Sequence, residues 1–280
     1  PFTNGCRFYA VAALELLDVP GEYHINNKTG DLHFLPLKPM TSETNVMVSV
    51  LNTVVEAGAD HHSFKDMTIS VARAGPAFTT VANGTTVGTH VTVENCTVSN
   101  SGGGCLALQG NFNTAKGNAV FGCGSSGIYV IAGDVNTLSP GNASVVGNNM
   151  TQVARIQRTY APGVAFSGVG NYVANNTVSD VPHTAITGGG NDWMFEYNTI
   201  THACYETIDT GAFYIGRSWS QRGNVARYNV FDTVRPTEKL AQTSCSQNAF
   251  VRSSLSLSHT HTHTLTHSLT YSLTHSLTLW

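Results

Sequence analysis

The phrase Val-Ala-Asn-Asn-Thr-Val-Ser-Asp (173–180) returns twice more, as Phe-Glu-Tyr-Asn-Thr-Ile-Thr-His (195–202) and Ala-Arg-Tyr-Asn-Val-Phe-Asp-Thr (226–233). In each copy an Asn stands one or two residues before an apolar β-forming residue. Looser copies cover 65–70, 93–100, 116–122 and 146–153. The anchor positions, spaced 22 to 31 residues apart, are Met67, Cys96, Asn118, Asn149, Asn176, Asn198 and Asn229. A period in this range with variable insertions is typical of a β-solenoid. We therefore expect the Asn side chains to stack as a ladder, each amide bonded to the next coil.

The repeats divide the chain into three parts. Residues 46–250 alternate short strand-like runs with Gly- and Asn-rich turns, which predicts a solenoid with three short strands per coil. Residues 1–45 differ: 8–17 has helical spacing of apolar groups, and 22–37 reads as a hairpin around a Gly-containing loop. Residues 251–280 are almost wholly Ser, Thr, Leu and His. We expect this low-complexity tail to be disordered or artefactual and to lie outside the fold.

The composition narrows the classes of function. At 280 residues and 41% hydrophobic, the chain can bury a core of its own. Only 11% of its residues are charged and the net charge is −3, so we expect no nucleic-acid partner. No apolar run is long enough to span a membrane, and we expect a monomer. The compartment stays open; Asn-X-Ser/Thr sequons are compatible with a secreted protein.

The six cysteines carry no recognisable metal pattern. They are Cys6, Cys96, Cys105, Cys123, Cys204 and Cys245. None forms a Cys-X-X-Cys pair, and no Asp-rich calcium cluster is evident, so we expect neither a metal nor a cofactor. Because Cys96 occupies an anchor position, we interpret it as a stacked interior residue rather than half of a disulfide.

Residues 202–224 concentrate the chemistry. Charge is scarce elsewhere, yet this segment holds Glu206, Asp209, Arg217, Arg222, Tyr205, Tyr214 and Trp219. Carboxylates supply general acids, bases and nucleophiles, and aromatic rings stack on sugar faces. The alternative is a structural salt-bridge cluster at a corner of a coil. The residues alone leave both readings open.

Several blocks in the same region resemble right-handed parallel β-helix glycoside hydrolases of the α-L-fucosidase/xylanase type. The blocks are Tyr-Ala-Pro-Gly-Val (160–164), Gly-Val-Gly-Asn (168–171), Pro-His-Thr-Ala-Ile (182–186), Gly-Gly-Asn-Asp (189–192), Glu-Tyr-Asn (196–198), Glu-Thr-Ile-Asp-Thr-Gly-Ala (206–212), Tyr-Ile-Gly-Arg-Ser-Trp (214–219) and Arg-Gly-Asn (222–224). Residues 17–23 and 29–34 resemble the segment that precedes the helix in that family. The resemblance implies an all-β fold, namely a right-handed parallel β-helix. It also implies that the protein acts on a plant- or algal-type polysaccharide or oligosaccharide.

The resemblance also implies roles for individual residues. It places a catalytic carboxylate at Asp209, with Glu206 beside it. It suggests substrate contacts from Tyr160, His183, Asn191, Asp192, Tyr214, Arg217 and Trp219. A buried structural role is the alternative for His183, and a solvated loop position for Tyr160.

One carboxylate of the family pattern is missing. A Tyr-Leu-Asp-Asp motif is expected just after 247–250, where this chain instead enters its tail, and Ser218 replaces an acid of the family pattern. Glycoside hydrolysis normally uses two carboxyl groups, about 5 Å apart for retention or roughly 6.5–9.5 Å for inversion. The sequence therefore predicts an incomplete hydrolase with little activity. A polysaccharide lyase or uronate epimerase, and a non-catalytic glycan-binding or surface solenoid, remain as alternatives.

Overall fold

The computed structural model describes residues 13–207, 210–216, 218–236, 271–272 and 277–279. The chain divides into two compact units, Pro1–Val48 and Ser49–Trp280. In the first unit, β1 (Tyr23–Ile25) pairs antiparallel with β2 (Leu32–Phe34), so the expected hairpin is present. The helix expected over 8–17 is absent from 13–17, the part of that segment that the structure describes. Residues 13–17 contain a single 3₁₀ turn, η1 (Leu14–Leu16), and 8–12 lie outside the described residues.

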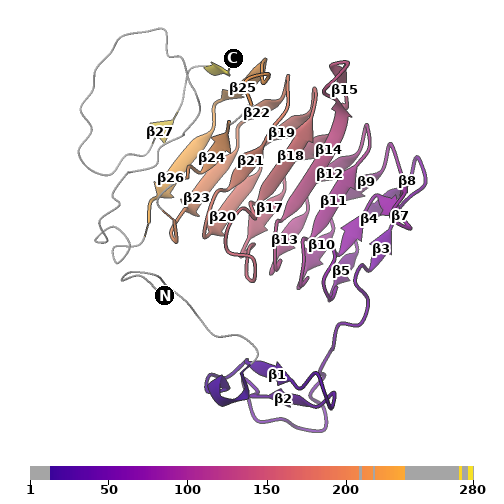
Figure 1. The fold of residues 1–280 in the computed structure, drawn as a ribbon, viewed down its shortest axis with the longest axis vertical. Coiled ribbons are helices and arrows are strands. Elements are labelled where there is room, and N and C mark those ends of the chain that lie inside the picture. The colour runs from indigo at the N-terminus through magenta and orange to yellow at the C-terminus, as the bar shows by residue number, and fades with distance from the viewer. Residues whose placement is uncertain (1–12, 208–209, 217, 237–270, 273–276, 280) are drawn as a thin grey trace. The chain divides into compact units, whose positions relative to one another are not determined.

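The second unit is a parallel β-helix, as the repeats predict. In the described residues, seven coils each contribute one strand to each of three stacked sheets, whose strands run side by side in Figure 1. Sheet 1 contains β3 (Val55–Glu56), β6 (Phe78–Thr79), β11 (Leu106–Gln109), β14 (Ile128–Asp134), β18 (Val164–Gly168), β21 (Ile186–Gly188) and β24 (Phe213–Ile215). Sheet 2 contains β4 (Ser63–Lys65), β9 (Thr92–Glu94), β12 (Thr114–Lys116), β16 (Ser144–Val146), β19 (Tyr172–Ala174), β22 (Met194–Glu196) and β25 (Asn224–Arg227). Sheet 3 contains β5 (Thr68–Ser70), β10 (Thr97–Ser99), β13 (Ala119–Phe121), β17 (Asn149–Thr151), β20 (Thr177–Val181), β23 (Thr199–Ala203) and β26 (Val230–Val234).

Five further strands of the described residues in this unit lie outside this regular path. The hairpin β7 (Val81–Ala82) and β8 (Thr86–Val87) interrupts one coil, and β15 (Ser139–Pro140) folds back on β14. In the tail, β27 (Tyr271–Ser272) pairs antiparallel with β26, and β28 (Leu277–Leu279) pairs antiparallel with β25. These two short pieces of the tail therefore lie against the last coil.

The inside of the coils is filled by alternate residues of every strand. Val, Leu, Ile and Ala dominate, and the inward side chains of successive coils stack in register, as with Val98, Val120 and Met150 of sheet 3. Later coils hold aromatic rings instead: Phe166 and Phe195 have ring centroids 4.8 Å apart, and Phe195 packs edge-on against Phe213 at 4.9 Å. Burial of this apolar surface is the main driving force of the fold.

The Asn ladder lies at the corner between sheets 2 and 3. Its members are Asn118, Asn148, Asn176, Asn198 and Asn229, each at most 3% exposed. Each Oδ1 accepts the backbone N–H of the equivalent residue in the preceding coil, for example Asn148 N to Asn176 Oδ1 at 2.9 Å. Cys96 occupies the preceding rung and donates its N–H to Asn118 Oδ1 at 2.9 Å, so it is a buried free cysteine as expected.

The predicted register of the ladder was wrong in one coil. Asn149, taken as the anchor, is an exposed residue of β17, and Asn148 carries the rung. The reason is the turn before each rung, where the backbone has positive φ; Gly147 (φ 68°) fills that place here, as Asn175 (φ 55°) does in a later coil. Because Gly and Asn adopt this left-handed conformation most readily, the rung follows them directly.

A second Asn column lies at the corner between sheets 1 and 2. Asn113, Asn171 and Asn224 are buried there, one in every second coil. The residue one coil earlier donates its backbone N–H to each, as Trp193 does to Asn224 Oδ1 at 3.0 Å. The sequence repeat did not reveal this column, because apolar residues fill the coils between its members.

Candidate functional site

Loops of unequal length border sheet 1 on both sides. Those that enter it from sheet 3 form the 3–1 corner and include 152–163, 182–185 and 204–212. Those that leave it toward sheet 2 form the 1–2 corner and include the β14–β15 hairpin, 189–193 and 216–223. Between them, the outward residues of sheet 1 are mostly small: Ala165 and Thr187 lie in register between Tyr129 and Tyr214. A ligand can therefore lie on this face between two walls of loops.

At the 3–1 corner, Glu206 is held by Arg158 across 48 residues of sequence. The guanidinium binds the carboxylate through both Nε, at 2.9 Å from Oε2, and Nη2. The carboxylate raises the pKa of Arg158, so the guanidinium stays charged. Arg158 also donates to the Tyr205 hydroxyl at 3.4 Å and to the Ala154 carbonyl at 3.2 Å, which fixes the loop 152–163 over the loop 204–212.

Two more candidate residues meet at this corner. The rings of Tyr160 and His183 have centroids 4.7 Å apart. His183 is 4% exposed, whereas Tyr160 is 62% exposed and has φ of 54°, an unusual conformation for a bulky side chain. The strained turn thus presents the Tyr160 ring to solvent above a buried imidazole.

Asp180 and His202 also belong to the 3–1 corner, and the sequence reasoning missed them. Asp180 Oδ1 lies 2.6 Å from His202 Nδ1, and its Oδ2 accepts from the Thr151 hydroxyl at 3.1 Å. The His202 ring stacks on Tyr205 with centroids 4.6 Å apart, which joins the pair to the Arg158–Glu206 contact. Both residues lie four positions after a ladder Asn. Aligning the coils on that ladder places the carboxylate and the imidazole side by side.

The other predicted site residues do not lie with Glu206 in the described structure. Asp209 and Arg217 lie outside the described residues. Tyr214 lies on the outer face of sheet 1 in β24. Asn191, Asp192 and Trp219 lie at the 1–2 corner, at the far ends of the sheet 1 strands from Glu206. The structure therefore brings Glu206, Tyr160 and His183 together and separates them from these three residues.

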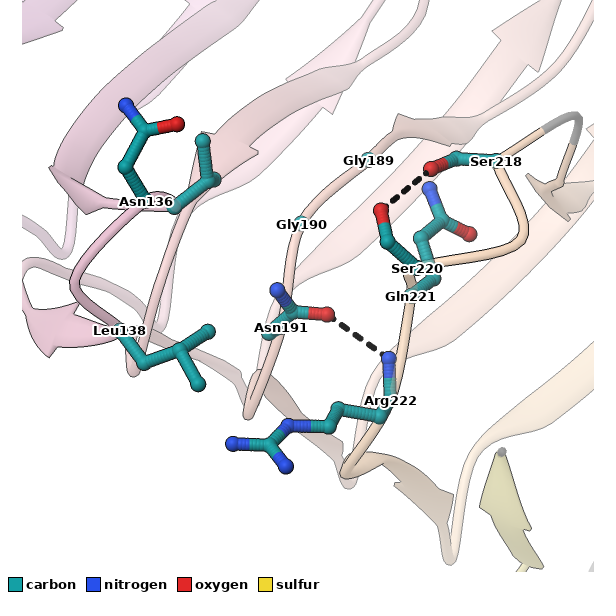
Figure 2. A pocket seen from close by; sticks show the side chains of 10 residues that line it. Asn136, Leu138, Gly189, Gly190, Asn191, Ser218, Ser220, Gln221 and Arg222 are labelled. Atoms are coloured by element: carbon teal, nitrogen blue, oxygen red, sulfur yellow. Dashed lines mark hydrogen bonds between the residues drawn. The ribbon is translucent and has the colours of Figure 1, made fainter.

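The 1–2 corner contains an open pocket of about 650 Å³. Figure 2 shows the side chains that line it, which are Val135, Asn136, Leu138, Gly189, Gly190, Asn191, Ser218, Ser220, Gln221 and Arg222. We call residues 189–191 the floor of the pocket, and residues 218–222 form one of its walls. Asn191 Oδ1 accepts a hydrogen bond from the backbone N–H of Arg222 at 2.7 Å, which ties the floor to this wall. Asp192, next to the floor, is exposed, and Trp219 between Ser218 and Ser220 is fully exposed.

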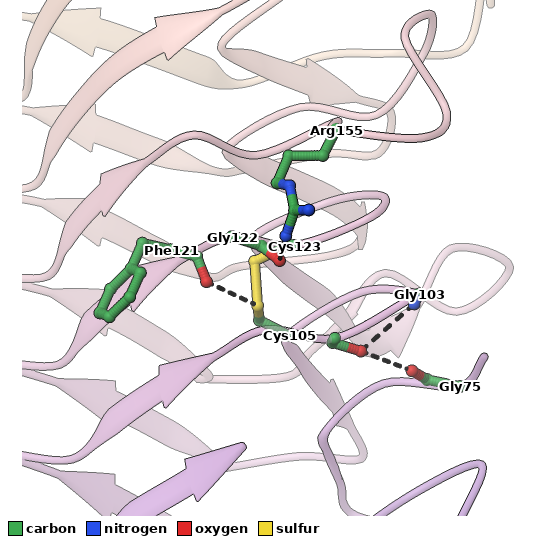
Figure 3. The surroundings of a disulfide bond; sticks show 8 residues. Gly75, Gly103, Cys105, Phe121, Gly122, Cys123 and Arg155 are labelled. Atoms are coloured by element: carbon green, nitrogen blue, oxygen red, sulfur yellow. Dashed lines mark hydrogen bonds between the residues drawn. A yellow bond between two sulfur atoms is a disulfide. The ribbon is translucent and has the colours of Figure 1, made fainter. Parts of the chain in front are cut away.

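A disulfide supports the 3–1 corner. Cys105, just before β11, is bonded to Cys123, just after β13, and Figure 3 shows this bond with its surroundings. The loop 152–163 rests on the same turn, because Arg155 donates its backbone N–H to the Cys123 carbonyl at 3.0 Å. The spacing of the cysteines gave no indication of this pairing.

Within the described residues, no cluster of three or more His, Cys, Asp or Glu side chains could hold a metal ion. In that same part of the chain, no helix is long and apolar enough to cross a membrane.

Comparison with known proteins supports the fold. No protein-family profile matches the sequence, and no curated protein is similar to it. A solved structure described as a glycoside hydrolase is similar, with a TM-score of 0.67 and 15% sequence identity over 80% of this chain and 49% of the other. This chain thus spans about half the length of that protein. The resemblance to β-helix glycoside hydrolases is confirmed at the level of the fold: the protein is an all-β parallel β-helix.

Proposed function

We propose that the protein is carbohydrate-active, and that it binds a plant- or algal-type polysaccharide along sheet 1 and hydrolyses it slowly at the 3–1 corner. The observation that carries this proposal is the Glu206 carboxylate, which Arg158 holds at the corner that also contains Tyr160, Tyr205 and His183. Carboxylates and aromatic rings at the edge of an open face are what sugar chemistry requires. The fold shared with a glycoside hydrolase supports the same reading.

The environment of Glu206 suits some catalytic roles better than others. A bidentate guanidinium favours the ionised carboxylate, so Glu206 is suited to act as a base or to stabilise positive charge on the sugar, not as the general acid. We assign the second carboxyl role to Asp209, three residues later in the same loop. The contact between Asp180 and His202 borders the site through Tyr205, and its imidazole is the other group that could exchange a proton with the substrate.

A disulfide is typical of proteins from oxidising compartments, and Cys105–Cys123 therefore supports secretion as part of this proposal. A secreted protein meets polysaccharides outside the cell.

The test is turnover of aryl-fucoside and aryl-xyloside substrates by the full chain and three variants. Glu206→Gln and Asp209→Asn should each lower kcat by about a hundredfold or more. Glu94→Gln, which removes a carboxylate from the outer face of sheet 2, should leave it unchanged. Melting temperatures of all variants show whether the fold is kept. Unchanged turnover in Asp209→Asn would sink the assignment of that residue.

Two alternatives are separated by the same measurements. A lyase or epimerase needs a cation to neutralise the substrate carboxylate, and the Arg158 guanidinium is already paired with Glu206, which disfavours it. An absorbance rise from an unsaturated uronate, on a polyuronate substrate, would favour it nonetheless. A non-catalytic glycan-binding solenoid is favoured by the same ion pair, and it would show oligosaccharide binding with no turnover.

A further inference from the structure

The pocket at the 1–2 corner has rigid walls. One wall is the β14–β15 hairpin, which carries Asn136 and Leu138. Within its turn, Asp134 accepts the Asn136 backbone N–H at 2.8 Å and the Thr137 hydroxyl at 3.1 Å. These bonds lower the pKa of Asp134 and keep its carboxylate occupied inside the turn. The hairpin therefore contributes a preformed wall without a free acid in the pocket lining.

The floor approaches the backbone of the coil beneath it. A side chain at Gly190, where φ is 127°, would place Cβ 1.9 Å from the Gly168 carbonyl oxygen, so only glycine fits. At Gly189 a Cβ would lie 2.8 Å from Gln221 Nε2, and its absence lets the Gln221 amide lie over the floor. Packing on the coil beneath thus requires glycine at 190, and glycine at 189 leaves room for the Gln221 amide.

Among the described residues that line the pocket, Arg222 is the only charged one. Other cations are paired with carboxylates, as Lys116 is with Glu94 and Arg227 with Glu196. The exposed guanidinium of Arg222 pairs with no acidic side chain in the part of the chain that the structure describes. Figure 2 shows its side chain extending on the side of the pocket bordered by Leu138. A guanidinium in this setting is suited to a planar or tetrahedral anion.

Trp219 adds an independent observation. Its side chain is fully exposed, between two serines that line the pocket. An indole ring left entirely in water, on the loop that borders the pocket, is a surface on which a sugar ring can stack. The amides of Asn136, Asn191 and Gln221 lie within the same pocket and can hydrogen-bond sugar hydroxyls.

We propose that this pocket binds an acidic sugar residue of the polysaccharide, with Arg222 pairing to its carboxylate or sulfate group and Trp219 stacking on a neighbouring ring. The ligand class, a saccharide, rests on the proposed function. The pocket is separated from the Glu206 corner by the sheet 1 strands, where the four-residue step from Ala185 to Gly189 spans roughly 13 Å at ~3.3 Å per residue. The pocket thus selects an acidic unit some distance from the bond at the Glu206 corner.

The test is calorimetric titration of the full chain with three probes: tetragalacturonate, a sulfated fuco-tetrasaccharide and neutral xylotetraose. At least one acidic probe should bind more tightly than the neutral one, and its affinity should fall as salt rises. Arg222→Gln should weaken that binding by about tenfold or more, since a charge-assisted contact is lost. Trp219→Ala should weaken binding of all probes that bind. Arg73→Gln, which removes an exposed guanidinium several coils away, is the matched control and should bind normally.

Aryl-glycoside turnover separates this proposal from the proposed function. Glu206→Gln should lower turnover yet keep the binding of acidic probes, and the control Arg73→Gln should keep both. If the wild-type protein shows no turnover and Arg222→Gln no longer binds the acidic probes, the pocket assignment would be supported and hydrolysis refuted. Wild-type binding by Arg222→Gln, or equal affinity for neutral and acidic probes, would overturn the pocket assignment. The better acidic probe tells a uronate from a sulfate ester.

Discussion

Single side chains of the Asn ladder connect three coils at once. Asn176 makes four hydrogen bonds: its Oδ1 accepts from the backbone N–H and the amide of Asn148, and its Nδ2 donates to the Val145 carbonyl and to Asn198 Oδ1. All of these groups are buried, so no water can replace the bonds. A buried polar group left without a partner costs about 1–3 kcal/mol. The ladder therefore fixes the register of the coils as strongly as the apolar core does.

This predicts a large contrast between neighbouring residues. Asn176→Ala should lower the free energy of unfolding by about 2–4 kcal/mol, because it leaves buried groups of two coils unsatisfied. Asn149→Ala, on the exposed side of β17, should change it by less than about 0.5 kcal/mol. Urea denaturation followed by circular dichroism measures both. Equal effects from the two variants would restore Asn149 as the rung.

Cys204, beside the candidate site, should be chemically silent in the folded protein. Burial raises the pKa of its thiol to about 12. Since the raised pKa means that the folded state binds the proton more tightly, this contribution to stability is present at neutral pH and is lost as pH rises toward 12. Disulfide-exchange labelling at pH 8, read by peptide mass spectrometry, should leave Cys204 unmodified until denaturant is added. Rapid labelling of the native protein would contradict the buried placement.

At the scale of elements, the disulfide and the loop 152–163 form one supporting unit. The bond closes a separation of 18 residues and joins the corners of neighbouring coils. Arg155 then ties the loop to that corner, and Arg158 of the same loop holds Glu206. Positions so far apart in sequence meet only because corner loops of successive coils stack.

Breaking the disulfide should therefore destabilise the corner. The free energy of unfolding of a Cys105→Ser, Cys123→Ser double variant should be about 2–4 kcal/mol lower than that of wild type, a typical loss for a loop of this size. Chemical denaturation with and without reductant measures it. The reductant should lower the free energy of unfolding of wild type and leave that of the double variant unchanged. If the reductant left the stability of wild type unchanged, the disulfide would not form in the protein.

For the whole molecule, periodic features could be predicted and singular ones could not. The Asn phrase recurs in most coils, so it indicated the β-helix, whereas the hairpin before it was predicted from two β-forming runs around a Gly-containing loop. The Asp180–His202 pair can be found once the coils are aligned on the ladder. The disulfide and the pocket each occur once, and no repeat predicts them. The candidate residues in 202–224 were found by composition, but composition cannot tell which end of a strand a residue occupies. Glu206 and Trp219 therefore looked like one cluster although sheet 1 separates them.

The stacked architecture makes a last prediction about dynamics. In a solenoid each coil contacts only its neighbours, so a strand with partners on both sides opens less often than one at the end of its sheet. The strands β14, β16 and β17 pair on both sides, whereas β3, β4 and β5 lie at the ends of the three sheets. Hydrogen-exchange mass spectrometry should find exchange in the end strands at least about tenfold faster, which corresponds to roughly 1.4 kcal/mol of opening free energy. The three strands of one coil should exchange alike, because they open together. Uniform protection from β3 to β17 would mean that the coils unfold as a single cooperative block, and that the ladder transmits stability to the edge of the stack.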